Sequence, residues 1–284
     1  MHRFLLHNGK VREAADPLLT AGQVGLLNGW GVFSTIRVID GVLFAFDRHF
    51  ERMMRDAETM RVPFPADAAA LESALLLLVE ANQAWNATLR VSVIRNKGGM
   101  WTGPEPRRDY DVVAFTAEKK NWGEGVRLGI VPDARHSASP FAGTKILSWS
   151  HNLAWLEGAQ SRGLDEVILL NERGRVSECT SANIFISEGN RIWTTPLSSG
   201  CLPGITRQIL LNDVRVPGVQ LGEKDLELAD LEAADEVFIT STTRGLLPVL
   251  EVEGLRIRNA GAAREPVQAA FRDYVAAYVE RAKR

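Results

Sequence analysis

Three segments of the chain combine residue types and spacing that could support chemistry on an amine. Lys145 follows a Gly-Thr pair, and Glu178 precedes Cys-Thr-Ser-Ala-Asn-Ile-Phe at residues 179–185. Leu-Pro-Gly-Ile-Thr at residues 202–206 opens an apolar pattern of helical spacing. A lysine amine can hold an aldehyde reversibly as a Schiff base, and a carboxylate favours a protonated ring nitrogen beside it. The unpaired N–H groups at a helix start bind anions such as phosphate.

This set of residues resembles the signature of the class IV aminotransferases, fold-type IV enzymes that use pyridoxal 5′-phosphate. The resemblance covers nearly the whole chain. It implies an α+β fold like that of D-amino acid aminotransferases, with a small N-terminal α/β domain and a larger C-terminal domain. It also implies that Lys145 is the catalytic residue, which binds the cofactor aldehyde and carries a proton between the substrate α-carbon and the cofactor. Glu178 would stand beside the pyridine nitrogen, and Leu202 would lie against the ring.

The resemblance further implies a phosphate site. Arg52 lies three residues after His49, as in the family, and its guanidinium fork suits a phosphate. Thr242 lies six residues before Pro248, which is the offset of a family threonine that touches the phosphate. His49 is expected to have a packing role. The expected phosphate-binding residues are Arg52, Ile205, Thr206, Ser241 and Thr242.

Residues in the first half of the chain resemble the substrate end of the family's site. Gly-Val-Phe-Ser-Thr-Ile-Arg at residues 31–37 resembles Phe-Glu-Gly-Ile-Arg of branched-chain aminotransferases and Phe-Thr-Thr-Ala-Arg of aminodeoxychorismate lyase. Arg90 matches the arginine of the branched-chain Tyr-Ile-Arg motif, although Thr88 stands at the tyrosine position. Arg95, with its following Gly-Gly loop, is closer to the lyase and the D-amino acid enzymes.

The turn after residue 240 departs from the branched-chain pattern. Small residues in that turn offer backbone N–H groups to the substrate carboxylate in those enzymes. This chain has Arg244 there, which could clamp the carboxylate directly or point outward. Trp30 and Trp101 could line an apolar pocket together with Phe33, or belong to the core. The expected substrate-binding residues are Phe33, Arg37, Arg90, Arg95, Thr243 and Arg244.

The resemblance leaves several related activities open. The leading hypothesis is an aminotransferase that moves an amino group from a branched-chain or other hydrophobic amino acid to a keto acid such as 2-oxoglutarate. The same scaffold serves D-amino acids and (R)-amines. Phe33-Ser34-Thr35 and the Gly98-Gly99 loop favour a lyase of the aminodeoxychorismate type, whereas the Lys145–Glu178 set disfavours a non-catalytic cofactor-binding protein. Because family sites are completed by a neighbouring subunit, we expect a homodimer or higher homo-oligomer.

The composition fits a cytoplasmic enzyme. The 284 residues are 45% hydrophobic, enough for a sizeable core. The formal net charge is −2 and there is no basic block, so nothing suggests a nucleic-acid or anionic-membrane partner, and we expect neither. Cys179 and Cys201 make no disulfide framework and are expected to be partly buried and without a catalytic role. The N-terminus has no signal-like apolar run, so we expect a cytoplasmic location. The five histidines are scattered, and we expect no metal site.

Periodicity and turn residues predict the elements that position these groups. The polar segment 118–124 is the expected linker between a small domain, 1–117, and a cofactor-binding domain, 125–284. Asp40-Gly41 predicts a hairpin within residues 36–44, and Asp47 is expected to cap the next helix. The remaining predicted elements are helix 67–82, strands 89–94, 112–116 and 126–131, helix 148–161, strands 166–170, 184–187 and 191–194, helices from 204 and near 225–233, strand 236–240, and a C-terminal helix from 265.

Overall fold

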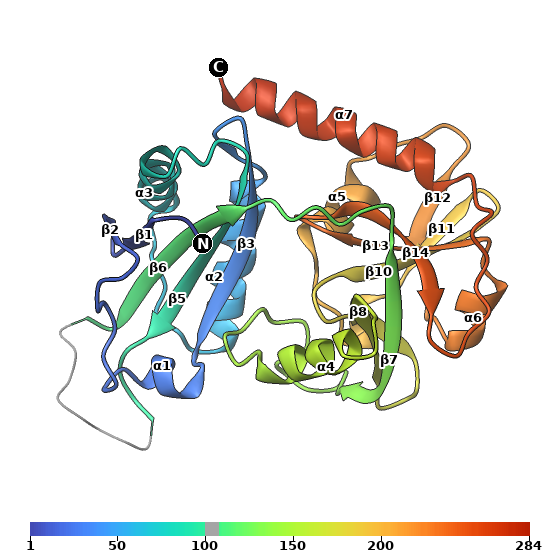
Figure 1. Ribbon diagram of the computed structural model, residues 1–284, viewed down its shortest axis with the longest axis horizontal. Helices are drawn as coiled ribbons and strands as arrows, with labels where there is room; N and C mark the ends of the chain where they lie inside the picture. Colours follow the sequence, from blue (N-terminus) through green and yellow to red (C-terminus); the bar gives the residue numbers. More distant parts are fainter. Residues whose placement is uncertain (100–107) are drawn as a thin grey trace. The chain divides into compact units, whose positions relative to one another are not determined.

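The computed structural model describes residues 1–99 and 108–284, and the chain forms two compact units (Figure 1). Unit 1 comprises Met1–Lys120, Thr144–Trp149 and Ala277–Arg284, and unit 2 comprises Asn121–Gly143 and Ser150–Ala276. The chain first passes from unit 1 to unit 2 within the expected linker. The two later returns to unit 1 have no counterpart in the expected contiguous domains, because they depend on contacts between distant parts of the chain.

Unit 1 is built on a six-stranded antiparallel sheet with the strand order β2-β1-β6-β5-β3-β4. Successive side chains of a strand point to opposite faces. On one face Ile36, Leu89 and Val91 are fully buried, and the other face carries positions of the candidate site. The strands are β1 (Phe4–His7), β2 (Lys10–Glu13), β3 (Gly31–Ile39), β4 (Val42–Leu43), β5 (Ala87–Arg95) and β6 (Tyr110–Glu118).

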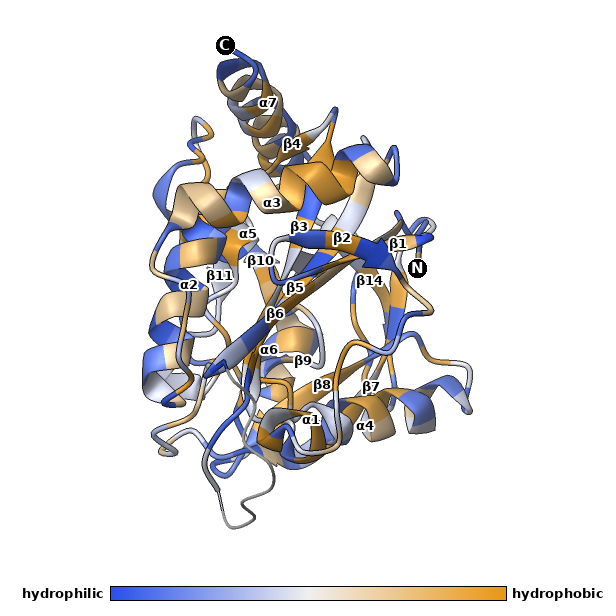
Figure 2. Cartoon of the chain, turned by 90° about the vertical axis from the view of Figure 1, so that its left-hand side faces the viewer, coloured by the Kyte–Doolittle hydropathy of each residue, from blue (hydrophilic) through white to orange (hydrophobic). Residues whose placement is uncertain are grey.

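Two helices, α2 (Phe46–Thr59) and α3 (Ala68–Ala81), cover the buried face of this sheet. Met53 of α2 and Leu75 of α3 are at most 1% exposed and share one core cluster with the strands. Figure 2 shows mixed hydrophobic and hydrophilic colours on α2 and a strongly hydrophobic stretch on α3. Asp67 caps α3 by accepting the Ala70 N–H at 2.9 Å, which confirms the predicted start of this helix.

The start of α2 differs from the prediction. Its N-cap is Ala45, which has a left-handed backbone with a φ of 54°, and Asp47 lies in the first helical turn. The predicted cap at Asp47 is therefore wrong. The hairpin leads straight into the helix and the chain reverses at Ala45, so Asp47 comes too late to cap. Its carboxylate still lies where the helix dipole favours a negative charge.

Two hairpins in unit 1 have tight turns of two residues. In each turn the second residue is glycine, and both residues have a positive φ. Asp40 and Gly41, with φ of 48° and 82°, join β3 to β4 and confirm the predicted hairpin. Asn8 and Gly9, with φ of 49° and 76°, join β1 to β2 in a hairpin that was not expected. Its two strands have only four residues each, which is too short to show a clear alternation.

Unit 2 contains an eight-stranded mixed sheet with the order β12-β11-β10-β13-β14-β7-β8-β9. The predicted strands of this region are confirmed, whereas β12 and β14 were not predicted. Pro248 lies inside β14, and proline argues against a strand in a sequence-based assignment. The strands are β7 (Val126–Arg135), β8 (Glu166–Asn171), β9 (Val176–Cys179), β10 (Asn183–Glu188), β11 (Arg191–Thr194), β12 (Gln220–Glu223), β13 (Glu236–Ser241) and β14 (Gly245–Val252).

Strands β8, β10 and β13 are buried along nearly their whole length, so their apolar runs form the core of unit 2. The predicted helices in this part of the chain are confirmed as α4, α5, α6 and α7; α7 begins in unit 2, and its last residues belong to unit 1. Within the described residues, no helix has both the length and the apolar composition that crossing a bilayer requires. The helices not yet delimited are α1 (Val24–Asn28), α4 (Ser150–Gln160), the 3-10 helix Leu197–Ser199, α5 (Ile205–Asn212), α6 (Leu228–Ala233) and α7 (Arg264–Ala282).

Candidate active site

Lys145 lies in a short extended segment that pairs with the edge of β3 in unit 1. The Phe33 N–H donates to the Lys145 carbonyl at 3.1 Å, and the Leu147 N–H donates to the Gly31 carbonyl at 2.9 Å. The segment can reach this edge because β4 pairs only with the other end of β3. A Cβ atom at residue 31 would lie 2.4 Å from the Val93 carbonyl oxygen of β5 and 2.5 Å from Cδ1 of Leu147 in this segment, so glycine is required there.

Helix α2 fixes the same segment through a carboxylate. The Lys145 N–H donates to Oδ2 of Asp56 at 3.1 Å, and Asp56 is fully buried. The Lys145 Nζ lies 4.5 Å from the centre of the Phe33 ring. A strand pairing and a buried carboxylate thus fix the backbone of Lys145, and an aromatic face lies beside its amine.

Arg52 lies one helical turn before Asp56 and is 5% exposed. Its Nη2 donates to Oγ of Ser34 at 2.8 Å, and the same oxygen lies 2.7 Å from Nδ1 of His49. A guanidinium only donates, so the Ser34 hydroxyl proton is left for His49 Nδ1, and His49 carries its own proton on Nε2. Ser34 therefore orders both side chains of the His-x-x-Arg pair.

Burial sets the charge states of this pair. Burial, together with the positive charges of Arg52 and Lys145, holds the pKa of His49 well below its usual value, so the imidazole is neutral at pH 7. Burial also lowers the pKa of Arg52 to about 10, although the Asp56 carboxylate acts in the opposite direction. Arg52 therefore remains a cation at pH 7 in a largely desolvated position, where an anion would bind strongly.

The other face of β3 and β5 carries two half-buried arginines, Arg37 and Arg90, which the strand register makes diagonal neighbours. The Arg90 guanidinium lies 3.8 Å over the Phe33 ring, the same ring that Lys145 contacts. Burial lowers the pKa of both arginines, and no carboxylate of the described chain is among the causes of either shift. Among the described residues of unit 1, this part of the sheet is thus a cationic surface without a carboxylate partner, and it lies beside the Lys145 amine.

Arg95 lies on the opposite face of β5 from these two arginines. Its guanidinium stacks over Trp30 at 4.1 Å and donates to the Arg61 carbonyl just beyond α2. Trp30 donates its Nε1–H to the Met60 carbonyl at 2.8 Å. The structure therefore places Arg95 and Trp30 in a corner at the end of α2, apart from Phe33. Trp101 lies outside the described residues.

Glu178, on β9 in unit 2, has a carboxylate held by two donors. Arg135 donates from Nε to one oxygen at 3.0 Å, and the Leu202 N–H donates to the other at 3.0 Å. Arg135 is itself fixed by the side-chain oxygen of Asn152 at 3.1 Å. The carboxylate is thus oriented before any ligand arrives, which is what a fixed electrostatic partner requires.

The chain after Leu202 enters α5 through Gly204, and a contact with Asn183 explains two motif positions at once. The Asn183 amide donates to the Leu202 carbonyl at 2.9 Å. A Cβ atom at residue 204 would lie 2.1 Å from the Asn183 side-chain oxygen, so only glycine fits there. The first turn of α5 contains the buried residues Ile205 and Thr206, whose N–H groups have no partner inside a helix. N–H groups in this position at a helix start suit an anion.

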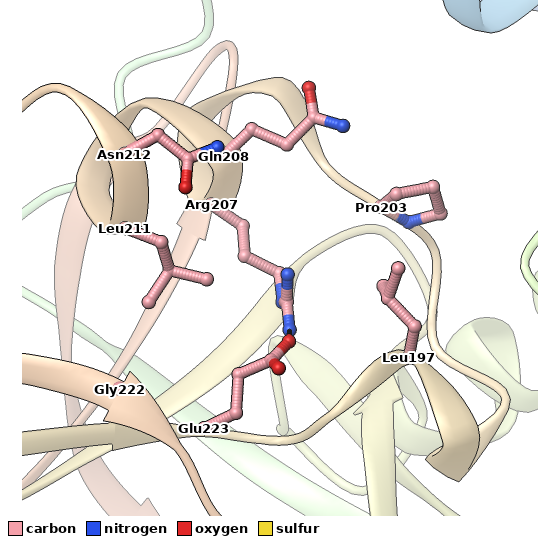
Figure 3. A pocket seen from close by; sticks show the side chains of 8 residues that line it. All are labelled: Leu197, Pro203, Arg207, Gln208, Leu211, Asn212, Gly222 and Glu223. Atoms are coloured by element: carbon pink, nitrogen blue, oxygen red, sulfur yellow. Dashed lines mark hydrogen bonds and ion pairs between the residues drawn. The ribbon is translucent and has the colours of Figure 1, made fainter.

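Arg207 anchors α5 by donating to the Thr195 carbonyl at 2.8 Å and to Glu223 (Figure 3). A pocket of about 410 Å³ lies beside this pair. None of the expected cofactor-binding residues lines this pocket, so it is distinct from the expected cofactor site. Its lining residues are Leu197, Pro203, Arg207, Gln208, Leu211, Asn212, Gly222 and Glu223.

Ser241, Thr242 and Thr243 are half-buried at the turn between β13 and β14. The Ser241 Oγ accepts the Arg244 N–H at 3.2 Å and lies 3.5 Å from the Thr243 hydroxyl. The Arg244 side chain is only 4% exposed and pairs with Glu166 at 3.0 Å. Arg244 therefore points inward and already has a carboxylate partner within unit 2.

Cys179 and Cys201 are free thiols and are both buried. Burial raises the pKa of both thiols, and nearby carboxylates act in the same direction. Since the thiolate is the reactive form, neither cysteine is prepared to act as a nucleophile. Their placement agrees with the non-catalytic role expected from the sequence.

The fold and these side chains define the class of protein. The family description amino-transferase class IV matches residues 31–252, and the chain belongs to this family of pyridoxal-phosphate-dependent enzymes. The protein is an enzyme of the aminotransferase type that acts on amino and keto acids.

Individual relatives carry two different substrate names. The chain is 30% identical over 257 residues to a putative branched-chain-amino-acid aminotransferase of Methanocaldococcus jannaschii, covering 89% of this chain and 88% of that protein. It is also 30% identical over 257 residues to a D-alanine aminotransferase of Bacillus licheniformis, covering 89% of each chain. The crystal structure of the Escherichia coli branched-chain amino acid aminotransferase shares the fold, with a TM-score of 0.88, 24% identity, and coverage of 97% of this chain and 95% of that one.

The residues of this chain fit pyridoxal phosphate. In unit 1, the buried Nε of Arg52 and Nε2 of His49 have no hydrogen-bond partner among the described residues, a surplus of donors that suits an anion. In unit 2, the N–H groups at the start of α5 suit a phosphate, and the oriented carboxylate of Glu178 suits a protonated pyridine nitrogen. The Lys145 side chain in unit 1 has the primary amine that suits the aldehyde.

Four residues that position the expected site residues were not anticipated in that role. Ser34 orders Arg52, Asp56 holds the backbone of Lys145, and Arg135 orients Glu178. Glu166 neutralises Arg244. Only Asp56 has a local signal, because it follows Arg52 by one helical turn; the other three act through contacts between distant strands and loops.

Proposed function

We propose that this enzyme moves the amino group of a hydrophobic amino acid, preferably a branched-chain one, to a keto acid such as 2-oxoglutarate. The observation that carries this proposal is the Phe33 ring, with the Lys145 Nζ at 4.5 Å and the Arg90 guanidinium at 3.8 Å. An apolar ring beside the reacting amine suits a hydrophobic side chain. An uncompensated guanidinium on the same ring suits the second carboxylate of an acidic keto acid.

Lys145 is the proposed catalytic residue. Pyridoxal phosphate, when bound, supplies an electron-withdrawing ring that makes the α-hydrogen of the amino substrate acidic. The Lys145 Nζ would take the proton from the substrate α-carbon and hold it beside the reacting atoms until it is returned. The pairing with β3 and the hydrogen bond to Asp56 keep the lysine backbone fixed during this transfer.

Different residues are proposed to contact the ring nitrogen, the ring face and the phosphate of the cofactor. Glu178, oriented by Arg135, is proposed to keep the pyridine nitrogen protonated. Leu202 is proposed to lie against the ring, and its N–H fixes the Glu178 carboxylate. The proposed phosphate ligands combine a guanidinium, helix-start N–H groups and hydroxyls, and they are Arg52, Ile205, Thr206, Ser241 and Thr242.

Arg37 and Arg90 are proposed to bind the second carboxylate of the acceptor. Both lie on the Phe33 face of the sheet. Burial alone lowers the pKa of each, and no carboxylate of the described chain opposes it. Thr243 is proposed to offer its backbone N–H to the α-carboxylate that every amino and keto acid substrate shares. The Phe33 ring would contact the side chain of a hydrophobic amino donor, and the two arginines would bind the side-chain carboxylate of an acidic acceptor. One site could then take the two substrates in turn.

A lyase of the aminodeoxychorismate type is the second candidate, because Phe33-Ser34-Thr35 resembles the lyase stretch. The Ser34 side chain, however, lies on the α2 face and contacts Arg52 and His49, not the Phe33 face. Ser34 orders Arg52, and this contact is equally useful to a transaminase and to a lyase. The resemblance at Ser34 therefore gives little support to the lyase. D-amino acids and (R)-amines need the same groups, so the stereochemistry is an outcome of the test.

The test is a single-turnover assay of the purified, cofactor-loaded enzyme. L-amino acids, D-amino acids, (R)-amines and aminodeoxychorismate are added one at a time without an acceptor, and the absorbance of the bound cofactor is followed. We expect branched-chain L-amino acids to change this absorbance and 2-oxoglutarate to restore it. Pyruvate release from aminodeoxychorismate, with no lasting change in absorbance, would instead establish the lyase.

We further propose that the working enzyme is a homodimer or higher homo-oligomer in the cytoplasm. The support is the family resemblance, in which a neighbouring subunit completes the site, together with a sequence that has only two cysteines, as is usual in a reducing compartment. Sedimentation equilibrium of the loaded enzyme is expected to give at least twice the mass of one chain. A single-chain mass with full activity would contradict the oligomer.

A further inference from the structure

A buried ion pair in unit 2 connects two parts of the proposed cofactor site. The Arg244 Nη2 lies 3.0 Å from Oε2 of Glu166, and the two side chains are 4% and 0% exposed. The Arg244 Nη1 also donates to the Ser181 carbonyl at 3.1 Å and to the Ser181 hydroxyl at 3.0 Å. The guanidinium stacks over the Trp122 ring at 3.9 Å. Arg244 is therefore held on several sides by side chains and backbone of its own unit.

Glu166 is equally engaged. One carboxylate oxygen accepts the Thr180 hydroxyl and the Val167 N–H, and the other accepts the Ser181 hydroxyl and Arg244. Thr180 and Ser181 directly follow the strand that ends with Glu178 and Cys179. The carboxylate thus ties this segment to the guanidinium.

Arg244 also belongs to the turn that carries the proposed phosphate and carboxylate contacts. Its N–H closes the turn onto the Ser241 Oγ at 3.2 Å. The register of β10 and β13 pairs Asn183 with Thr240, so the segment after Glu178 and the turn after Thr240 lie at the same edge of the sheet. The ion pair bridges these two neighbouring segments.

We propose that Arg244 and Glu166 are positioning residues that hold the turn of Thr242 and Thr243 in register with the segment that follows Glu178. The proposal rests on the proposed function, which assigns Thr242 and Glu178 to the cofactor. A buried ion pair adds little to stability compared with apolar packing, but breaking it leaves an uncompensated charge. Its two-sided hydrogen bonding specifies one arrangement of the two segments, and a cofactor contact made by both needs such a fixed arrangement.

The same contacts argue against Arg244 as a direct clamp for the substrate carboxylate. Nη1 and Nη2 already have acceptors, and Nε is buried with no hydrogen-bond partner in the described chain. Burial lowers the pKa of Arg244, while the Glu166 carboxylate acts in the opposite direction and favours the charged guanidinium. A substrate would have to displace Glu166 to reach this guanidinium.

The test compares Arg244→Met with a matched variant of another ion pair in unit 2. Arg264 pairs with Glu236, with side chains 13% and 6% exposed, and contacts none of the proposed cofactor residues. The dissociation constant of pyridoxal phosphate is measured by fluorescence titration of the full-length protein, and the urea midpoint is measured in parallel. We expect Arg244→Met to weaken cofactor binding about tenfold or more, and Arg264→Met to lower the urea midpoint without this loss.

Two further variants test the same ion pair. Arg244→Lys retains the charge but cannot reach Glu166 and Ser181 together, so an intermediate loss is expected and folding is preserved. Glu166→Gln is expected to weaken cofactor binding as Arg244→Met does. A lower urea midpoint with unchanged cofactor affinity in Arg244→Met would reduce the pair to a structural role.

Two other outcomes distinguish the positioning role of Arg244 from the proposed roles of the substrate and phosphate contacts. Loss of substrate affinity without loss of cofactor affinity in Arg244→Met would make Arg244 a direct clamp and overturn the positioning role. Unchanged cofactor affinity in Thr242→Ala would remove Thr242 from the proposed phosphate site. If Thr242→Ala weakens the cofactor and Arg244→Met does not, the positioning role alone fails.

Discussion

The two units handle charge in opposite ways. In unit 1, Arg37 and Arg90 lie half-buried without carboxylate partners, and the buried Arg52 has an Nε without an acceptor in the described chain. In unit 2, Glu178 is paired with Arg135, and Arg244 is paired with Glu166. Unit 1 therefore presents arginines that can bind ligand anions. Unit 2 balances its charges internally and offers an oriented carboxylate and helix-start N–H groups.

The difference suggests a division of labour that substitutions can break. Side chains of unit 1 should contribute the reacting group and the affinity for anionic parts of the ligands. Side chains of unit 2 should act mainly by fixing positions and by holding one charge on the cofactor ring. Variants in unit 1 are therefore expected to affect chemistry and binding directly, and variants in unit 2 to act through orientation.

The largest effect is expected for Lys145→Ala, which removes the only group of unit 1 proposed to move a proton. Since a positioned general base contributes up to about 10⁴-fold, we expect the single-turnover rate to fall by about that factor. Lys10→Ala, an exposed lysine of the same unit on β2, serves as the control. A Lys145→Ala protein that turned over like the wild type would remove the proposed catalytic role.

Glu178→Gln is expected to have the next largest effect, through unit 2. The amide keeps an oxygen for Arg135 or the Leu202 N–H but carries no charge to hold the ring proton. Loss of one preorganised electrostatic contact predicts a fall in kcat of about 100-fold. The absorbance spectrum of the bound cofactor should change with it. An unaltered kcat at unaltered cofactor occupancy would show that Glu178 does not face the ring nitrogen.

Arg52→Met tests whether the buried cation of unit 1 binds the phosphate. A lost hydrogen bond to a charged group costs about 1.5–3 kcal/mol, so the dissociation constant of pyridoxal phosphate should rise by about 30-fold. Arg48→Met, one turn earlier on α2, should leave it near the wild-type value. Ser34→Ala should give a smaller loss of cofactor affinity, because Arg52 keeps its charge and loses only its acceptor. Equal affinities in all four proteins would place the phosphate elsewhere.

Arg90→Met separates acceptors within unit 1. We expect the KM for 2-oxoglutarate to rise about tenfold, since the guanidinium would no longer bind the second carboxylate. The KM for pyruvate, which lacks that carboxylate, should change little and is the internal control. A parallel rise for both keto acids would assign Arg90 to the common α-carboxylate and not to acceptor selection.

The smallest expected effect is on the pH dependence of stability, through a contact in unit 2 between Ser137 and Glu172. The Ser137 N–H and hydroxyl hold the pKa of Glu172 at about 2, below its ordinary 4.5. A carboxyl with a lowered folded pKa contributes stability that is complete above about 4.5 and is lost as the pH falls towards 2. The urea midpoint of the wild type should therefore fall more steeply over this range than that of Glu172→Gln. Parallel curves would show that the Ser137 contacts do not stabilise the charged form.

Individual elements show where local patterns suffice and where they fail. Asp67 preceded a helix and capped it, because capping involves only a few consecutive residues. Asp47 looked equivalent but did not cap, because the preceding hairpin moved the helix start to Ala45. β14 was not predicted, because Pro248 argues against a strand when only the local sequence is considered. Whether a proline is tolerated in a strand depends on its neighbours in the sheet, which the local sequence does not show.

The candidate site divides in the same manner. The pattern around Lys145, Glu178 and residues 202–206 was sufficient to indicate the family, which the match over residues 31–252 establishes. The sequence left the orientation of Arg244 open, and only the fold brings Glu166 against its guanidinium. Arg95 and Arg90 were both expected to bind substrate, on different motifs, yet the alternation of β5 and the contact with Arg61 place Arg95 on the other face.

The sequence by itself determined the chemistry that is available: an amine, a carboxylate, a glycine-led helix start and a set of arginines at characteristic spacings. These depend on residue types and on short-range order, which the chain carries in any conformation. Tertiary structure alone decided which cations are neutralised and which stay available, and which side chains hold Lys145 and Glu178 in place. Those properties depend on burial and on contacts between residues far apart in the chain, and such contacts exist only once the sheets have formed.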